Sequence, residues 1–340
     1  MTDGQLTFQE DNVAQTVNGA YDKLRLGNFS EAIKLLDHAI ELDVEYKGVT
    51  ATLKCVRFWK ERLVRVDEIQ GAESRANYLL DQWSTFRGFS NRIEDLPERC
   101  FQDIKYFIHA TAVAYLLEND PQQKISMLTS QNAQMKNQNS QEISIGHCYK
   151  IMGDFSNAIG YLEKANRRNP NSAVLIAELA DCYSLINEPN AAKVLFREAF
   201  YLGADQIIID TLESALIKNL IISLKKEGIT QDIEEWLPVY GNISGTFNVK
   251  RELKPVEYGR LKQSIFKLES RVNMNPELKE NSSLTTTQGN SESSLVPKLI
   301  NRYFWLIDHY LSTNEKSTKI NEILERLKHL DVAIYQKYVT

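Results

Sequence analysis

The fold of this chain is decided between residues 139 and 200, which read NSQEISIGHCYKIMGDFSNAIGYLEKANRRNPNSAVLIAELADCYSLINEPNAAKVLFREAF. Apolar residues recur there at one spacing of 34 positions. The matched pairs are Ile145 and Leu179, Tyr149 and Tyr183, Ala158 and Ala192, Leu162 and Phe196, and Ala165 and Ala199. So many pairs at a single spacing are too specific for an ordinary helical bundle, so the stretch is interpreted as two copies of a helix–turn–helix unit.

The residues at fixed places in this unit resemble the tetratricopeptide repeat (TPR) family. Residues 145–149, Ile-Gly-His-Cys-Tyr, match the L-G-x-x-Y of the family's first helix, and residues 153–155, Gly-Asp-Phe, match its turn. Pro170 closes this copy. The next copy departs from the family pattern at its turn, where Asn187 and Pro189 replace the usual Gly and Tyr or Phe. The resemblance implies an all-α solenoid of stacked antiparallel helix pairs with a concave binding surface.

A further copy lies near the N-terminus. It has the turn Gly-Asn-Phe at residues 27–29, but Lys23 stands where the first helix of the family carries Tyr. We place the clearest repeats at residues 12–45, 139–172 and 173–206, with degenerate repeats between and after them.

Elementary packing arguments agree with the family resemblance. Small side chains at Ala158 and Ala192 let two helices approach closely, because the distance between helix axes follows side-chain size. Gly27 and Gly153 fall where a helix ends and the chain reverses, a place that favours a positive φ. We therefore expect both alanines to lie at close helix–helix contacts.

Helices are also predicted in the segments around these repeats. Apolar residues recur every three or four positions over residues 49–69 and 72–86, and again from residue 97 to residue 117. The Asn- and Gln-rich residues 130–140 predict a loop or a frayed helix start. Pro255 suits the first turn of a helix that caps the solenoid.

Composition divides the chain into three predicted segments. Residues 1–272 form the TPR-like α-solenoid, residues 273–295 a polar linker of low complexity, and residues 296–340 a C-terminal helical hairpin. Two amphipathic helices bury little core by themselves. The hairpin must therefore dock on the solenoid, pair with another chain in self-association, or remain a detached and marginally stable element.

Bulk composition excludes several classes of protein. A hydrophobic content of 43% over 340 residues is ample for a folded chain. A net charge of −5 argues against a dedicated nucleic-acid binder. The N-terminal residues lack the features of a signal peptide, and the most apolar stretch, residues 215–224, is far shorter than the roughly 20 residues that span a bilayer. We expect a cytoplasmic protein without membrane insertion.

Catalytic and metal-binding motifs are not found in the sequence. The four cysteines and five histidines are scattered, without the close spacings of a zinc or redox site. A Gly-rich phosphate loop and a paired nucleophile and base are also missing. We therefore expect no enzyme activity, no cofactor and no metal.

Candidate binding residues follow from the TPR resemblance, because the first helices of TPR units line the concave face. The positions there that core packing does not use imply a partner-binding groove, and the alternative is a plain solvated face. Interface energy concentrates in aromatic and Arg side chains, which favours Tyr21 and Arg25. The ten implied residues are Val17, Tyr21, Leu24, Arg25, Ile143, His147, Lys150, Ala177, Asp181 and Ser184.

Two more specific binding functions are disfavoured. The Lys and Asn that some TPR units present to a terminal carboxylate are missing from the matching positions, and Asp181 would repel such a group. The basic residues between positions 54 and 65 are interpreted as a solvated helix face, as charge runs on helices usually are.

The sequence thus predicts a non-catalytic protein–protein interaction scaffold or adaptor with a protein or peptide partner. One alternative comes from composition: the Asn-rich sequence with many Lys and Ile is similar to bacterial TPR proteins of spirochaetes, some of which assemble the collar of periplasmic flagellar motors. That likeness rests on no motif. A TPR regulator associated with nucleic acid is the other alternative, and it would require a helix–turn–helix domain or a broad basic surface.

Overall fold

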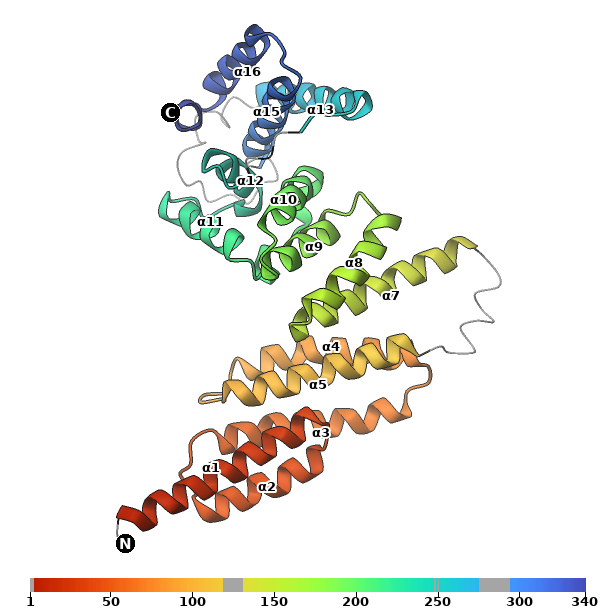
Figure 1. Cartoon of the computed structure of the whole chain (residues 1–340), viewed down its shortest axis with the longest axis vertical. Coiled ribbons are helices and arrows are strands. Elements are labelled where there is room, and N and C mark those ends of the chain that lie inside the picture. Colours follow the sequence, from red (N-terminus) through yellow and green to blue (C-terminus); the bar gives the residue numbers. More distant parts are fainter. Residues whose placement is uncertain (1–2, 119–130, 248, 250, 275–293) are drawn as a thin grey trace. The chain divides into compact units, whose positions relative to one another are not determined.

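The computed structural model describes residues 3–118, 131–247, 249, 251–274 and 294–340. Within these residues the chain consists of helices joined by turns and short loops, and no strand occurs among them (Figure 1). The all-α class predicted from the sequence is confirmed. The chain divides into two compact units, residues 1–161 and residues 162–340.

The first unit is a succession of helices, each packed on the next. The helix α1 contacts both α2 and α5, while α4 and α7 each pack on α5. The three helices predicted between residues 49 and 117 are observed as α3, α4 and α5. The helices are α1 (Asp3–Arg25), α2 (Phe29–Leu42), α3 (Val49–Glu68), α4 (Ala72–Ser90), α5 (Glu98–Leu117), α7 (Gln131–Met152) and the first half of α8 (Phe155–Arg168).

Aromatic residues fill the core of this unit between α3 and α4. Trp59 is fully buried. Its ring meets Phe86 edge-on at 5.4 Å and stacks on Trp83 at 6.3 Å between centroids. The Asn- and Gln-rich residues 131–140, expected as a loop or frayed start, are the first turns of α7.

Gly27 ends α1 in a conformation that only glycine adopts easily. Its φ is +81°, and a Cβ atom placed there would lie 2.2 Å from Cε2 of Phe107. Both the backbone angle and the contact with α5 therefore require glycine at this turn. Gly153 and Gly228 also have positive φ angles, of +83° each, as the repeat pattern predicts for Gly153.

The second unit continues the helical pairs after α8. The helices α9 and α10 pack closely along each other. The elements are α9 (Ala173–Leu185), α10 (Pro189–Gly203), the 3-10 turns η2 (Ala204–Gln206) and η3 (Ile209–Thr211), α11 (Ala215–Lys226), α12 (Ile233–Ile243), α13 (Pro255–Met274), α15 (Leu295–Ser312), α16 (Ser317–Leu330) and α17 (Val332–Val339).

The α9–α10 pair shows how the chain meets the repeat geometry despite its departures from the family pattern. Asn187 takes the place of the turn glycine with a φ of +63°, a left-handed conformation that Asn tolerates better than most residues. Pro189 is the first residue of α10, where its missing N–H costs nothing. Ala192, Phe196 and Ala199 are fully buried in the shared core, as predicted.

Replacing Ala192 with tryptophan is expected to lower the free energy of unfolding by about 1–3 kcal/mol, because an overpacked helix contact forces side chains and backbone apart. Thermal unfolding followed by circular dichroism measures the change. Asn190→Trp is the matched control, since Asn190 is exposed on the first turn of the same helix and surface changes cost little. An unchanged melting temperature for Ala192→Trp would show that the repeat register is wrong.

The C-terminal segment is packed rather than detached. The helix α15 packs on both α12 and α13, and its buried side chains share one core with Leu261, Leu268 and Val272 of α13. The predicted boundary at residue 272 therefore does not coincide with a break in the core. The segment also holds three helices where a two-helix hairpin was expected, because α17 follows α16 after Asp331, whose carboxylate accepts the N–H of Ile334. Most of the predicted linker, residues 275–293, lies outside the described residues.

A buried ion pair joins the repeat helices of this unit to the C-terminal helices. The guanidinium of Arg197, on α10, is only 3% exposed. It donates to the carboxylate of Asp308 on α15 and to the carbonyl of Val249. It also lies over the ring of Trp305, 4.7 Å from the centroid. Removing either charged partner would leave the other charge buried without this ion pair.

Candidate partner-binding groove

The predicted binding residues on α1 serve the fold instead. Val17, Tyr21 and Leu24 are buried in the core of the first unit, and burial raises the pKa of Tyr21. Arg25 is half-exposed, but it pairs with Asp103 at 3.0 Å and stacks on Tyr106 at 4.1 Å. The face of α1 that was expected to meet a partner packs against α5, so the prediction does not hold for its three apolar or aromatic members.

On α7 the predicted residues divide between buried and accessible. Lys150 is only 4% exposed, so it does not present its charge to a partner. Ile143 and His147 are partly exposed. These two side chains, with Arg25, are the members of the predicted set in the first unit that a partner could touch.

On α9 the predicted residues form a structural contact within the chain. Ala177 and Asp181 are buried. The Asp181 carboxylate accepts the backbone N–H groups of Glu213 at 2.9 Å and Ser214 at 2.7 Å. The hydroxyls of Ser184 and Ser214 lie 2.7 Å apart. This face of α9 is therefore covered by the segment that starts α11, and Asp181 was misread because a buried backbone acceptor and an exposed binding acid look alike in a sequence.

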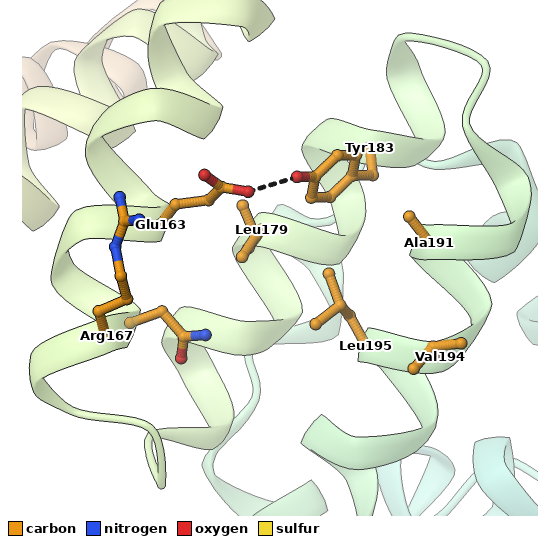
Figure 2. A pocket seen from close by; sticks show the side chains of 8 residues that line it. Glu163, Arg167, Leu179, Tyr183, Ala191, Val194 and Leu195 are labelled. Atoms are coloured by element: carbon orange, nitrogen blue, oxygen red, sulfur yellow. Dashed lines mark hydrogen bonds between the residues drawn. The ribbon is translucent and has the colours of Figure 1, made fainter. Parts of the chain in front are cut away.

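An open groove lies on another face of the second unit, between α8 and α10. Each wall uses residues three and four positions apart, which lie on one face of a helix. Figure 2 shows Glu163 and Arg167 across the groove from Ala191, Val194 and Leu195, with Leu179 and Tyr183 of α9 between them. The α8–α10 groove is lined by Glu163, Asn166, Arg167, Leu179, Tyr183, Ala191, Val194 and Leu195.

The floor and one wall of the groove are apolar. Leu179 is buried beneath it, Leu195 is partly exposed, and Val194 is 41% exposed at the rim. The small side chain of Ala191 leaves space beside them. Val194 and Leu195 lie outside the buried repeat positions 192, 196 and 199. Leu195 packs partly against the core of the unit, whereas the exposed side of Val194 faces the rim.

One polar contact crosses the groove and fixes its shape. The Tyr183 hydroxyl donates a hydrogen bond of 2.6 Å to the Glu163 carboxylate (Figure 2). This bond, together with burial, raises the pKa of Tyr183 to about 12. The hydroxyl therefore stays protonated at neutral pH and continues to donate to Glu163.

Two other polar side chains of the groove could form a hydrogen bond or an ion pair with a ligand. The Asn166 Oδ1 atom is shielded from solvent and has no hydrogen-bond donor in the described part of the chain. Arg167 is exposed, and no ion pair or hydrogen bond to it is found among the residues that the structure describes. The groove thus combines accessible apolar surface with one unfilled acceptor and one unpaired cation.

The sequence pattern does not predict this groove, although part of the signal is present in it. Leu179 and Tyr183 identify the repeat, and the family resemblance implies binding on the first helices. The neighbouring apolar pair Val194 and Leu195, next to buried repeat positions of α10, was the available hint. The missing information was the distance between α8 and α10, which a sequence pattern alone does not supply.

Successive packed helix pairs, with buried small residues at their contacts, define an α-helical repeat protein. Residues 151–216, which span the groove, match the family model of the tetratricopeptide repeat. This part of the chain therefore consists of tetratricopeptide repeats, and such repeats generally mediate protein–protein interaction. No curated protein matches the sequence significantly.

Two kinds of feature, a membrane-spanning helix and a metal-binding cluster, are absent from the described residues. None of their helices combines the length and the apolarity required to cross a bilayer. Nor do three or more His, Cys, Asp or Glu side chains gather there in an arrangement that could hold a metal ion.

Proposed function

We propose that the protein is a non-catalytic adaptor that binds a segment of a partner protein in the α8–α10 groove. The observation that carries this proposal is the accessible apolar surface of the groove, where Val194 is 41% exposed beside Leu195 and above Leu179. Clustered apolar surface bordered by polar residues is typical of interaction sites. The surface lies within the family-matched residues.

The competing surface is the accessible remainder of the predicted first-helix face in the first unit, namely Arg25, Ile143 and His147. Arg25 already pairs with Asp103 and stacks on Tyr106. A partner that bound there would have to replace these contacts or add to them. The α8–α10 groove requires no such exchange, which is why it is preferred.

Site-specific cross-linking distinguishes the two surfaces. A photoreactive phenylalanine analogue is placed at Val194, at Ile143 and, as a control, at Ile222, which is 51% exposed on α11. The full chain is irradiated with native cell extract, and adducts are identified by mass spectrometry. We expect a defined partner to be cross-linked from position 194 and not from position 222. Cross-linking from position 143 alone would contradict the proposal.

The identified partner then allows a quantitative test. Val194→Asp places a charge on the apolar wall and is expected to weaken binding at least about tenfold, equivalent to about 1.4 kcal/mol. Ile222→Asp makes the same change on exposed surface elsewhere and is expected to bind like the wild type. Equal affinities for the two variants would exclude the groove as the binding surface, provided that both melt at the wild-type temperature.

A further inference from the structure

The groove's unfilled acceptor indicates the backbone conformation of its occupant. Buried polar atoms are nearly always hydrogen-bonded, and an unpaired one costs free energy. Asn166 lines the groove, and the amide torsion of an Asn side chain is soft, so rotation of the amide would let its Oδ1 atom accept a donor of the occupant. A backbone N–H of the occupant is the donor that every peptide carries, irrespective of its sequence.

The need for a free backbone N–H favours an extended segment over a helical one. Beyond its first turn, an α-helix uses all its N–H groups within itself. An extended segment has N–H groups free along its whole length, and its side chains point alternately to opposite sides. An extended occupant can therefore donate to Asn166 while one side chain lies on Leu179 and Leu195.

The charges of the groove indicate a second feature of the occupant. Arg167 follows Asn166 directly on α8 and is exposed, with no ionic partner in the described part of the chain. A guanidinium pairs best with a carboxylate, which it can bind through two parallel hydrogen bonds. The groove's own carboxylate, Glu163, accepts the Tyr183 hydroxyl at 2.6 Å and forms no ion pair with Arg167 among the described residues.

From this arrangement we infer that the α8–α10 groove selects an extended, acidic segment of a partner protein. The segment places an apolar side chain on Leu179, Val194 and Leu195, donates a backbone N–H to Asn166 Oδ1, and directs an Asp or Glu, within two positions of the apolar residue, to Arg167. The inference rests on the proposed function, because it specifies the occupant of the same groove.

A displayed library of random linear nonapeptides, selected on the full chain, tests this specificity. We expect the wild type to enrich peptides that carry an apolar residue and an acidic residue within two positions of each other. Arg167→Glu is expected to lose that preference and to enrich basic residues in the acidic position. Val194→Asp, the variant that blocks the groove, is expected to lose the enrichment.

The backbone contact is tested with one selected peptide in fluorescence anisotropy. N-methylation of each amide in turn removes one N–H donor. We expect methylation at one position to weaken binding to the wild type at least about tenfold, and to have little further effect on Asn166→Leu, because the acceptor is already removed. The two changes would then be strongly non-additive, as expected for groups in direct contact.

The outcomes separate this inference from the proposed function. Groove-dependent peptides without acidic residues, or peptides insensitive to N-methylation at every amide, would overturn the extended acidic occupant and leave the adaptor function standing. Peptides whose enrichment is unaffected by Val194→Asp, or no enrichment at all, would count against the groove itself and so against both.

Discussion

Replacing Arg197 with methionine is expected to lower the free energy of unfolding by about 3–5 kcal/mol, the usual cost of leaving a buried charge without its partner. Arg197 is 3% exposed and Asp308 13% exposed, so water replaces the lost interaction only in small part. Urea-induced unfolding followed by tryptophan fluorescence measures the loss, since Trp305 lies against the guanidinium.

The double variant Arg197→Met with Asp308→Leu is the matched control. Apolar residues of similar volume often replace a buried ion pair with little loss of stability. The double variant is therefore expected to recover most of the stability that the single variant loses. A single variant as stable as the wild type, or a double variant no more stable than the single one, would show that the pair is not what joins α10 to α15.

Truncating Asp181 to alanine is expected to cost about 2–4 kcal/mol. Its carboxylate is fully buried and accepts two backbone N–H groups, from Glu213 and Ser214, at the start of α11. A buried donor left unsatisfied costs about 1–3 kcal/mol, and hydrogen bonds to charged groups are the stronger ones. The same unfolding assay measures the change.

Asp210→Ala provides the control for this prediction. Asp210 lies on the same connecting segment and is exposed, so its removal is expected to change stability by less than about 0.5 kcal/mol. If Asp181→Ala were equally harmless and instead weakened partner binding, Asp181 would belong to a binding surface, as the sequence suggested, and its structural role would be refuted.

The repeat fold was predictable because its signals are local and periodic. Ala158, Ala192 and Gly153 occupy the positions that the 34-residue spacing implies, and all three behave as expected, the alanines buried and the glycine with positive φ. Helix limits followed from apolar periodicity and from Pro97 and Pro255. These features depend on neighbours within one or two turns of helix, which the sequence displays directly.

The binding surface was less predictable because burial depends on contacts between distant segments. Leu24 and Asp181 occupy positions that the family leaves open, but here the core of the first unit buries Leu24 and the start of α11 covers Asp181. The packing of α15 on α12 and α13 was likewise one of several possibilities, since an amphipathic pattern shows that a face is buried and not what buries it.

Methyl-resolved NMR of the full chain is the most direct test of the central claim, that a partner segment occupies the α8–α10 groove. A peptide selected as above is titrated into chain labelled at its Leu and Val methyl groups. The account predicts that the resonances of Leu179, Val194 and Leu195 shift with the binding curve, while those of Leu24 and Val17 in the first unit stay in place. Shifts confined to residues outside the groove, with Leu179, Val194 and Leu195 unchanged at saturation, would contradict it.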